Sequence, residues 1–172
     1  GNSIPPDPIM AAGPNHIIAC VNSQFRVWDK EGNLLANVNA DSWISPVIQA
    51  GAFDPQIIYD HYAGRWFMLW DWQDPTILQA YFIISYSDDD DPFGTWHMYR
   101  LDARLNGSTN SPYWGDYPQI GYDEEAIYIN SRQFTFDANP LYGYNKIRIL
   151  NKTELYSSNG GNLPWKDIWN IG

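Results

Sequence analysis

DPQIIYDHYAGRWFMLW, residues 54–70, is the stretch of sequence that decides the predicted fold. Gln56–Tyr59 and Arg65–Trp70 are rich in the β-branched and aromatic residues that favour strands. Asp60 and the segment His61–Gly64 lie between them and supply turn-forming residues. The stretch therefore predicts two β-strands joined by a tight turn.

The hairpin pattern recurs along the chain. Residues 116–129, DYPQIGYDEEAIYI, repeat the Pro-Gln-Ile-x-Tyr-Asp of residues 55–60. A fainter copy, DPIMAAG followed by Pro14 and then NHIIA, occupies residues 7–19. Three copies of one hairpin predict a repeat protein.

Composition indicates a folded, extracellular chain. The 172 residues are 44% hydrophobic and 16% aromatic, which is more than a disordered chain carries. The net charge of −10 opposes binding to a phosphate backbone, so we expect no nucleic-acid partner. No apolar run of about 18 residues and no basic, apolar leader is present, so we expect no membrane span and no remaining signal peptide. Scarce lysine with abundant Asp, Asn, Tyr and Trp fits secretion or the cell surface.

The order of strand and turn signals predicts an all-β chain. Short strand-like runs separated by Gly, Asn and Asp turns group into three units of about four strands, at residues 7–50, 51–104 and 116–157. Each unit has the size of one propeller blade. We therefore expect residues 1–172 to form one β-propeller-type array with an incomplete ring, and residues 158–172 to begin a further segment.

A family resemblance supports this interpretation. It is carried by four stretches in this order: PPDPIMAAGPNHIIACVNSQFRVWDKEGN, FDPQIIYDHYAGRWF, SDDDDPFGTWHMYRLD and GDYPQIGYDEEAIYI. These resemble the N-terminal blades of secreted bacterial β-propeller proteins of the sialidase-like type. Ser87–Trp96 also resembles the Asp-box turn of that family, S-x-D-x-G-x-T-W, with two extra residues before Gly94-Thr95-Trp96. The family's Asp-box stabilises a turn far from the catalytic centre, so the resemblance implies a fold rather than an activity.

The acidic run in this turn is a candidate metal site. Asp88, Asp89, Asp90 and Asp91 place four carboxylates on consecutive residues, which repel one another unless a cation, water or backbone amides relieve them. Calcium suits such a loop because it takes six to eight oxygen ligands in irregular geometry. The alternative is a solvated acidic hairpin tip.

Three tryptophans are candidate ligand contacts. Trp70 and Trp72 lie two residues apart and share one face of a strand, and Trp114 lies in a loop before a predicted strand. Flat aromatic faces beside Asp and Asn are typical of sugar binding. The alternative is that these indoles fill the space between packed sheets, although Trp114 is the best candidate for an exposed contact.

Other conspicuous residues have ordinary structural interpretations. Asp60 and Asp123 each close a strand and are expected to accept N–H bonds from the following turn. Cys20 is expected to be a small buried hydrophobic residue. The histidines, His16 and two others, lack the spacing of zinc sites.

The sequence leaves the question of catalysis open. Sixteen Asp and four Glu offer too many candidates for the carboxylate pair of a glycosidase, and the motifs of serine hydrolases and phosphate-binding loops are absent. Three functions remain. The first is a non-catalytic module that binds a glycan or a protein partner, with calcium as a candidate stabiliser. The second is part of a glycan-active hydrolase or lyase completed by further blades. The third is a structural, self-assembling extracellular protein, because three blades leave open faces that a longer chain or a second copy must cover.

Overall fold

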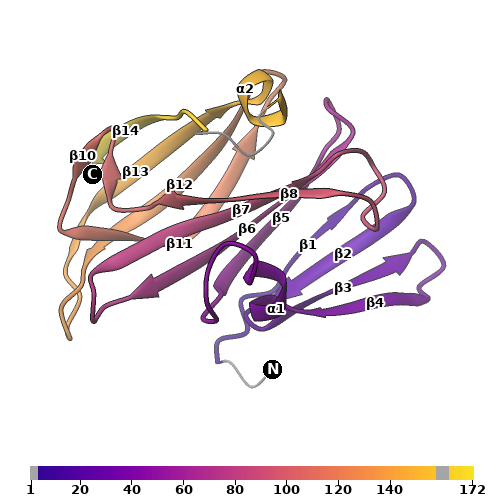
Figure 1. The fold of residues 1–172 in the computed structure, drawn as a ribbon, viewed down its shortest axis with the longest axis horizontal. Helices are drawn as coiled ribbons and strands as arrows, with labels where there is room; N and C mark the ends of the chain where they lie inside the picture. Colours follow the sequence, from indigo (N-terminus) through magenta and orange to yellow (C-terminus); the bar gives the residue numbers. More distant parts are fainter. Residues whose placement is uncertain (1–3, 158–162) are drawn as a thin grey trace. The chain divides into compact units, whose positions relative to one another are not determined.

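The computed structural model describes residues 4–157 and 163–172 and has an all-β fold (Figure 1). Three four-stranded antiparallel sheets account for most strands, and one two-stranded ribbon accompanies them. In each four-stranded sheet the strands are neighbours in chain order, so each sheet is a meander. The predicted all-β class is thereby confirmed, and the propeller-type arrangement stays a prediction. No sheet closes on itself among the described residues.

The first sheet corresponds to the first predicted unit. Its strands are β1 (Ile9–Ala12), β2 (His16–Val21), β3 (Gln24–Asp29) and β4 (Leu34–Asn39). The short helix α1 (Ala40–Ile44) follows, and its N-cap Asn39 accepts a hydrogen bond from the Ser42 N–H, as is usual for an asparagine at this position. The sequence analysis did not predict this helix.

The second sheet contains residues 54–70, the hairpin stretch on which the predicted fold depends. Its strands are β5 (Phe53–Asp60), β6 (Arg65–Asp74), β7 (Gln79–Ser87) and β8 (Trp96–Asp102). β6 and β7 are the two central strands, and every residue of β6 from Trp66 to Trp72 is buried. Because both faces of β6 are covered, its side chains do not alternate between core and solvent.

The third sheet takes in the C-terminal residues. Its strands are β11 (Tyr113–Tyr122), β12 (Ala126–Thr135), β13 (Tyr142–Asn151) and β14 (Lys166–Ile171), and the ribbon is β9 (Leu105–Asn106) with β10 (Thr109–Asn110). The short helix α2 (Lys152–Ser157) lies between β13 and β14 in the chain, and Asn151 Oδ1 accepts the N–H groups of Thr153 and Glu154.

The expected boundary at residue 158 is corrected by the position of β14. This strand pairs with β13, with Ile168 opposite Ile147 and Asp167 opposite Arg148. The C-terminal residues therefore complete the third sheet instead of beginning a further one. Residues 158–162, the first part of that expected segment, lie outside the described residues.

The residue before each repeated proline adopts the same unusual backbone angle. Asp7, Asp54 and Tyr117 have φ values of 46°, 45° and 46°, a left-handed region that non-glycine residues rarely occupy. Asp54 and Tyr117 lie within the first strand of their sheets, and Asp7 lies two residues before β1; each of these first strands is an edge strand. The pairing of β11 with β12 shifts register at Tyr117. Proline is tolerated at such edges and bulges because it has no N–H to donate.

The chain divides into two compact units. Unit 1 is Gly1–Trp70 with Ile83–Arg100, and unit 2 is Asp71–Phe82 with Leu101–Gly172. Trp43 is half-buried in unit 1, where its ring centroid is 5.0 Å from that of Phe25 and 5.1 Å from that of Trp96. Aromatic pairs in this edge-to-face arrangement stabilise a core beyond their buried area.

Candidate functional site

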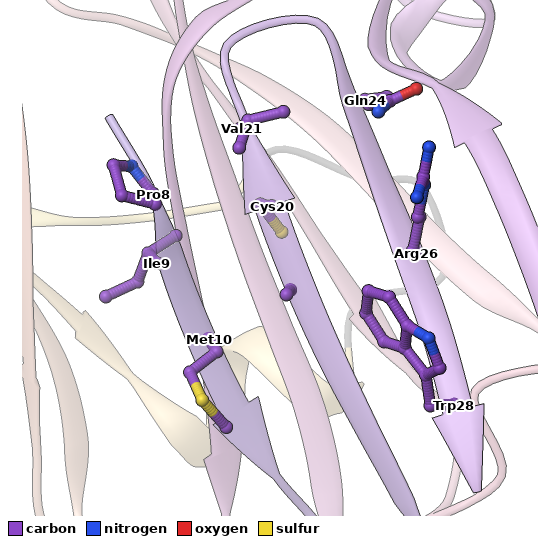
Figure 2. Close-up of a pocket in the computed structure, with 9 residues that line it drawn as sticks. Pro8, Ile9, Met10, Cys20, Val21, Gln24, Arg26 and Trp28 are labelled. Atoms are coloured by element: carbon purple, nitrogen blue, oxygen red, sulfur yellow. The ribbon is translucent and has the colours of Figure 1, made fainter. Parts of the chain in front are cut away.

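The first sheet carries a hollow of about 590 Å³ on one of its faces, entirely within unit 1 (Figure 2). The hollow is lined mainly by apolar residues of β1 and β2, to which β3 adds two polar side chains and an indole. The lining residues are Pro8, Ile9, Met10, Ala19, Cys20, Val21, Gln24, Arg26 and Trp28. An apolar hollow with a few polar groups is the usual form of a binding site.

The alternation of β3 creates this surface. Phe25 and Val27 are buried in the core, whereas Gln24, Arg26 and Trp28 are exposed or half-buried on the other face. Figure 2 shows these three side chains in a row along β3. A period of two residues separates the faces of any strand, so the sequence places Gln24, Arg26 and Trp28 on one face and Phe25 and Val27 on the other.

Cross-strand pairing fixes which residues surround Arg26. Ala19 of β2 and Asn37 of β4 are its partners in register, and Met10 of β1 pairs with Ala19. One layer across the sheet therefore runs Met10, Ala19, Arg26, Asn37. In this layer the guanidinium of Arg26 lies between apolar Met10 and Ala19 on one side and polar Asn37 on the other.

Within the described part of the chain, the guanidinium of Arg26 forms a hydrogen bond at one nitrogen. Its Nε donates to Asn37 Oδ1 at 3.3 Å, and the side chain reaches toward Gln24 (Figure 2). Among the described residues, neither terminal nitrogen has a hydrogen-bond or ion-pair partner. Two adjacent donors thus remain available on an exposed cation.

Cys20 contributes to the wall of the hollow without offering a reactive group. It is 1% exposed and forms no disulfide, and burial raises the pKa of its thiol. A thiol that stays protonated is a poor nucleophile. The prediction that Cys20 is a buried hydrophobic residue is confirmed.

The three tryptophans singled out in the sequence are buried. Trp70 is 0%, Trp72 4% and Trp114 8% exposed, so the expectation that Trp114 is exposed is wrong. Trp70 and Trp72 are buried because both faces of β6 are covered. Trp114 lies within β11 instead of a loop, and its Nε1 donates to the Thr135 carbonyl at 3.2 Å. Ligand contact by these residues stays a prediction, and the structure offers no exposed indole face there.

The acidic turn uses its carboxylates as acceptors of backbone N–H groups. Asp88 accepts from Thr95, and the Oδ1 atoms of Asp89 and Asp91 each accept from the residue two positions ahead. Asp90 contributes its carbonyl, which accepts from Trp66 Nε1 at 3.0 Å. These contacts relieve part of the repulsion between the carboxylates. Within residues 4–157 and 163–172 no group of three or more His, Cys, Asp or Glu could hold a metal, and calcium binding stays a prediction.

The repeated strand-closing aspartates have the structural role expected. Asp60 accepts from the N–H groups of Tyr62 and Ala63, and Asp123 accepts from those of Glu125 and Ala126. In Asp123 these bonds hold the pKa of the carboxyl below its ordinary range. The prediction of turn caps is confirmed.

Unit 2 contains a buried group of charges that the sequence did not reveal. Arg148 Nε donates to Asp167 Oδ1 at 2.9 Å, and both side chains are 0% exposed. The Arg148 guanidinium also lies 4.4 Å from the ring centroid of Trp165. Such a pair stabilises only when its remaining donors are satisfied, and Arg148 meets this condition by donating to the carbonyls of Asp102 and Leu105.

Lys146 lies beside this ion pair on β13. Its Nζ is buried and donates to the carbonyls of Ala103 at 2.6 Å and Leu105 at 2.9 Å. Burial, and then the nearby positive charge of Arg148, lower the pKa of Lys146 to about 7. The cluster is closed to solvent, so we assign it to the fold and not to a site.

The sequence analysis did not select the residues that line the hollow. The sequence alternates at Gln24–Trp28, with Phe25 and Val27 between the other three residues. Arg26 and Trp28 share a face by that alternation, and this signal could have identified them.

Comparisons of the chain with models of protein families, with curated proteins and with solved structures found no match. Among the residues that the structure describes, no helix is long and apolar enough to cross a membrane. The function of the hollow is therefore inferred from its lining residues and their hydrogen bonds.

Proposed function

We propose that this chain is a non-catalytic, secreted β-propeller-type module that binds a protein partner through the hollow on the first sheet. The observation that carries the proposal is the half-exposed, largely aliphatic surface around Arg26, with Met10 56% exposed at its edge. Three meander sheets in chain order support the propeller-type arrangement. Exposed apolar surface rimmed by polar groups is characteristic of interaction sites.

A protein fits this lining better than a glycan does. The apolar part of the hollow consists of Pro8, Ile9, Met10, Ala19 and Val21, and of these side chains only the weakly accepting thioether of Met10 can bond to a hydroxyl. A sugar placed there would lose water from several hydroxyl groups without replacement, which is costly. Apolar side chains of a peptide would instead gain from leaving water.

The test is whether peptides bind at the hollow. A phage-displayed random peptide library is selected against the immobilised chain, and synthetic copies of the enriched peptides are titrated by calorimetry. Ala19→Tyr fills the hollow with a residue that strands accept, and it should abolish binding. Ala138→Tyr, at an exposed position of unit 2, is the matched control and should leave the affinity unchanged. Absence of enriched peptides, or binding that survives Ala19→Tyr, would overturn the proposal.

A further inference from the structure

Arg26 is the cation of the hollow, and its charge has no counterpart in the described structure. Arg104, Arg132 and Arg148 each pair with a carboxylate. Arg26 has no such partner among the described residues, although the chain contains 20 acidic residues and 10 basic ones. Complementarity to this hollow therefore requires a negative charge from outside.

The hydrogen bond of Arg26 to Asn37 determines which of its N–H groups remain for an anionic group of the partner. Asn37 occupies Nε, so the bond fixes the plane of the guanidinium and leaves Nη1 and Nη2 as a pair. Two parallel N–H donors match the two oxygens of a carboxylate, and this bidentate geometry is stronger and more specific than a contact between point charges. Gln24, toward which the guanidinium points, adds a neutral amide beside the fork (Figure 2).

The geometry points to a partner segment that presents an Asp or Glu to the Arg26 fork and places apolar side chains against Met10, Ala19 and Val21. This inference rests on the proposed function, because it specifies the peptide that the hollow binds. The partner is an acidic-apolar peptide segment and not an acidic sugar, since among the described lining residues only Gln24, Arg26 and the indole N–H of Trp28 offer strong hydrogen-bonding groups to the occupant.

The expected effect of the carboxylate follows from the strength of charge-assisted hydrogen bonds. Replacing the acidic residue of a bound peptide by its amide should weaken binding by roughly ten- to a hundredfold. Arg26→Gln should cause a loss of similar size for the acidic peptide and little loss for the amide peptide. Arg26→Lys should restore only part of the affinity, because an ammonium cannot reproduce the planar fork.

The experiment compares the wild-type chain and Arg26→Gln as baits for the same random peptide library. The inference expects Asp or Glu flanked by aliphatic residues among wild-type selectants, and loss of that acidic preference with Arg26→Gln. Synthetic peptides from the wild-type selection, each made with Glu and with Gln, are then titrated against both proteins. Arg26 is exposed, so circular dichroism of the two proteins should be the same.

The outcomes separate this inference from the proposed function. Peptides that bind without acidic preference, yet are lost in Ala19→Tyr, would overturn the inference and leave the proposed function standing. Absence of peptide binding would overturn both. Sodium polygalacturonate serves as an acidic-sugar probe, and its Arg26-dependent binding in place of peptides would also overturn the inference.

Discussion

Replacing Lys146 with methionine should remove part of the pH dependence of the protein's stability. Lys146 is buried in unit 2 beside the cation Arg148, and the carboxylates that act on it are Asp167 of β14 and Asp102 at the end of β8. Methionine has a similar length and does not titrate. The substitution therefore removes one ionisable group from an enclosed environment.

The magnitude follows from the pKa of Lys146. The value is about 7 in the folded chain, against roughly 10.4 for an unperturbed lysine. Below pH 7 both the folded and the unfolded chain hold the proton, and the cost of burying the charge is fully present. Between pH 7 and about 10 the unfolded chain holds a proton that the folded chain has lost, so stability rises with pH by about 1.4 kcal/mol per unit. Between pH 6 and pH 8.5 this amounts to about 2 kcal/mol.

The assay is urea unfolding of both proteins at several pH values across this range, in the presence of a reductant. The wild type should gain about 2 kcal/mol relative to Lys146→Met as the pH rises from 6 to 8.5. The absolute difference at one pH has no fixed sign, since the variant also loses two hydrogen bonds to carbonyls. Lys30→Met, at an exposed turn, controls for the change in net charge. A difference between wild type and Lys146→Met that stays constant across the range would refute the reasoning.

Two further predictions concern the packing of unit 2. Gly115→Ala would place a Cβ 2.6 Å from Phe82 Cζ and should lower the free energy of unfolding by about 1–3 kcal/mol. Gly121→Ala, whose Cβ would have no neighbour closer than 4.0 Å, should lower it much less. Thermal unfolding of the two variants checks this. Asp167→Ala leaves the Arg148 guanidinium buried without its carboxylate and should cost about 3–5 kcal/mol in urea unfolding, and equal stability of variant and wild type would contradict it.

Features set by neighbouring residues were predictable from the sequence. The strands of the first sheet, the caps at Asp60 and Asp123 and the helix capped by Asn151 each depend on a side chain and the backbone a few residues away. Such local patterns are determined by turn chemistry and strand propensity. They were sufficient to predict the all-β class.

Features set by distant residues were not predictable in the same way. Trp70 and Trp72 lie two residues apart, as side chains do on the same face of a half-exposed strand. Both are nevertheless buried, because β6 is a central strand and both of its faces are covered. Lys146 and Arg148 also alternate along their strand, and two charges two residues apart usually indicate a solvent-exposed face. Their burial depends on distant partners: Asp167 on β14 pairs with Arg148, and the carbonyls of Ala103 and Leu105 accept from Lys146.

The same rule of charge satisfaction distinguishes Arg26 from the buried cations. Arg148 and Lys146 would destabilise the fold if their donors lacked partners, so carbonyls and a carboxylate of unit 2 surround them. Arg26 is exposed, so water can solvate its free nitrogens and the fold requires no partner for them. Water leaves when another surface covers the hollow, and an uncompensated guanidinium then becomes costly. A partner that covers Arg26 must therefore supply the acceptor itself, which links recognition at this face to the charge of the partner.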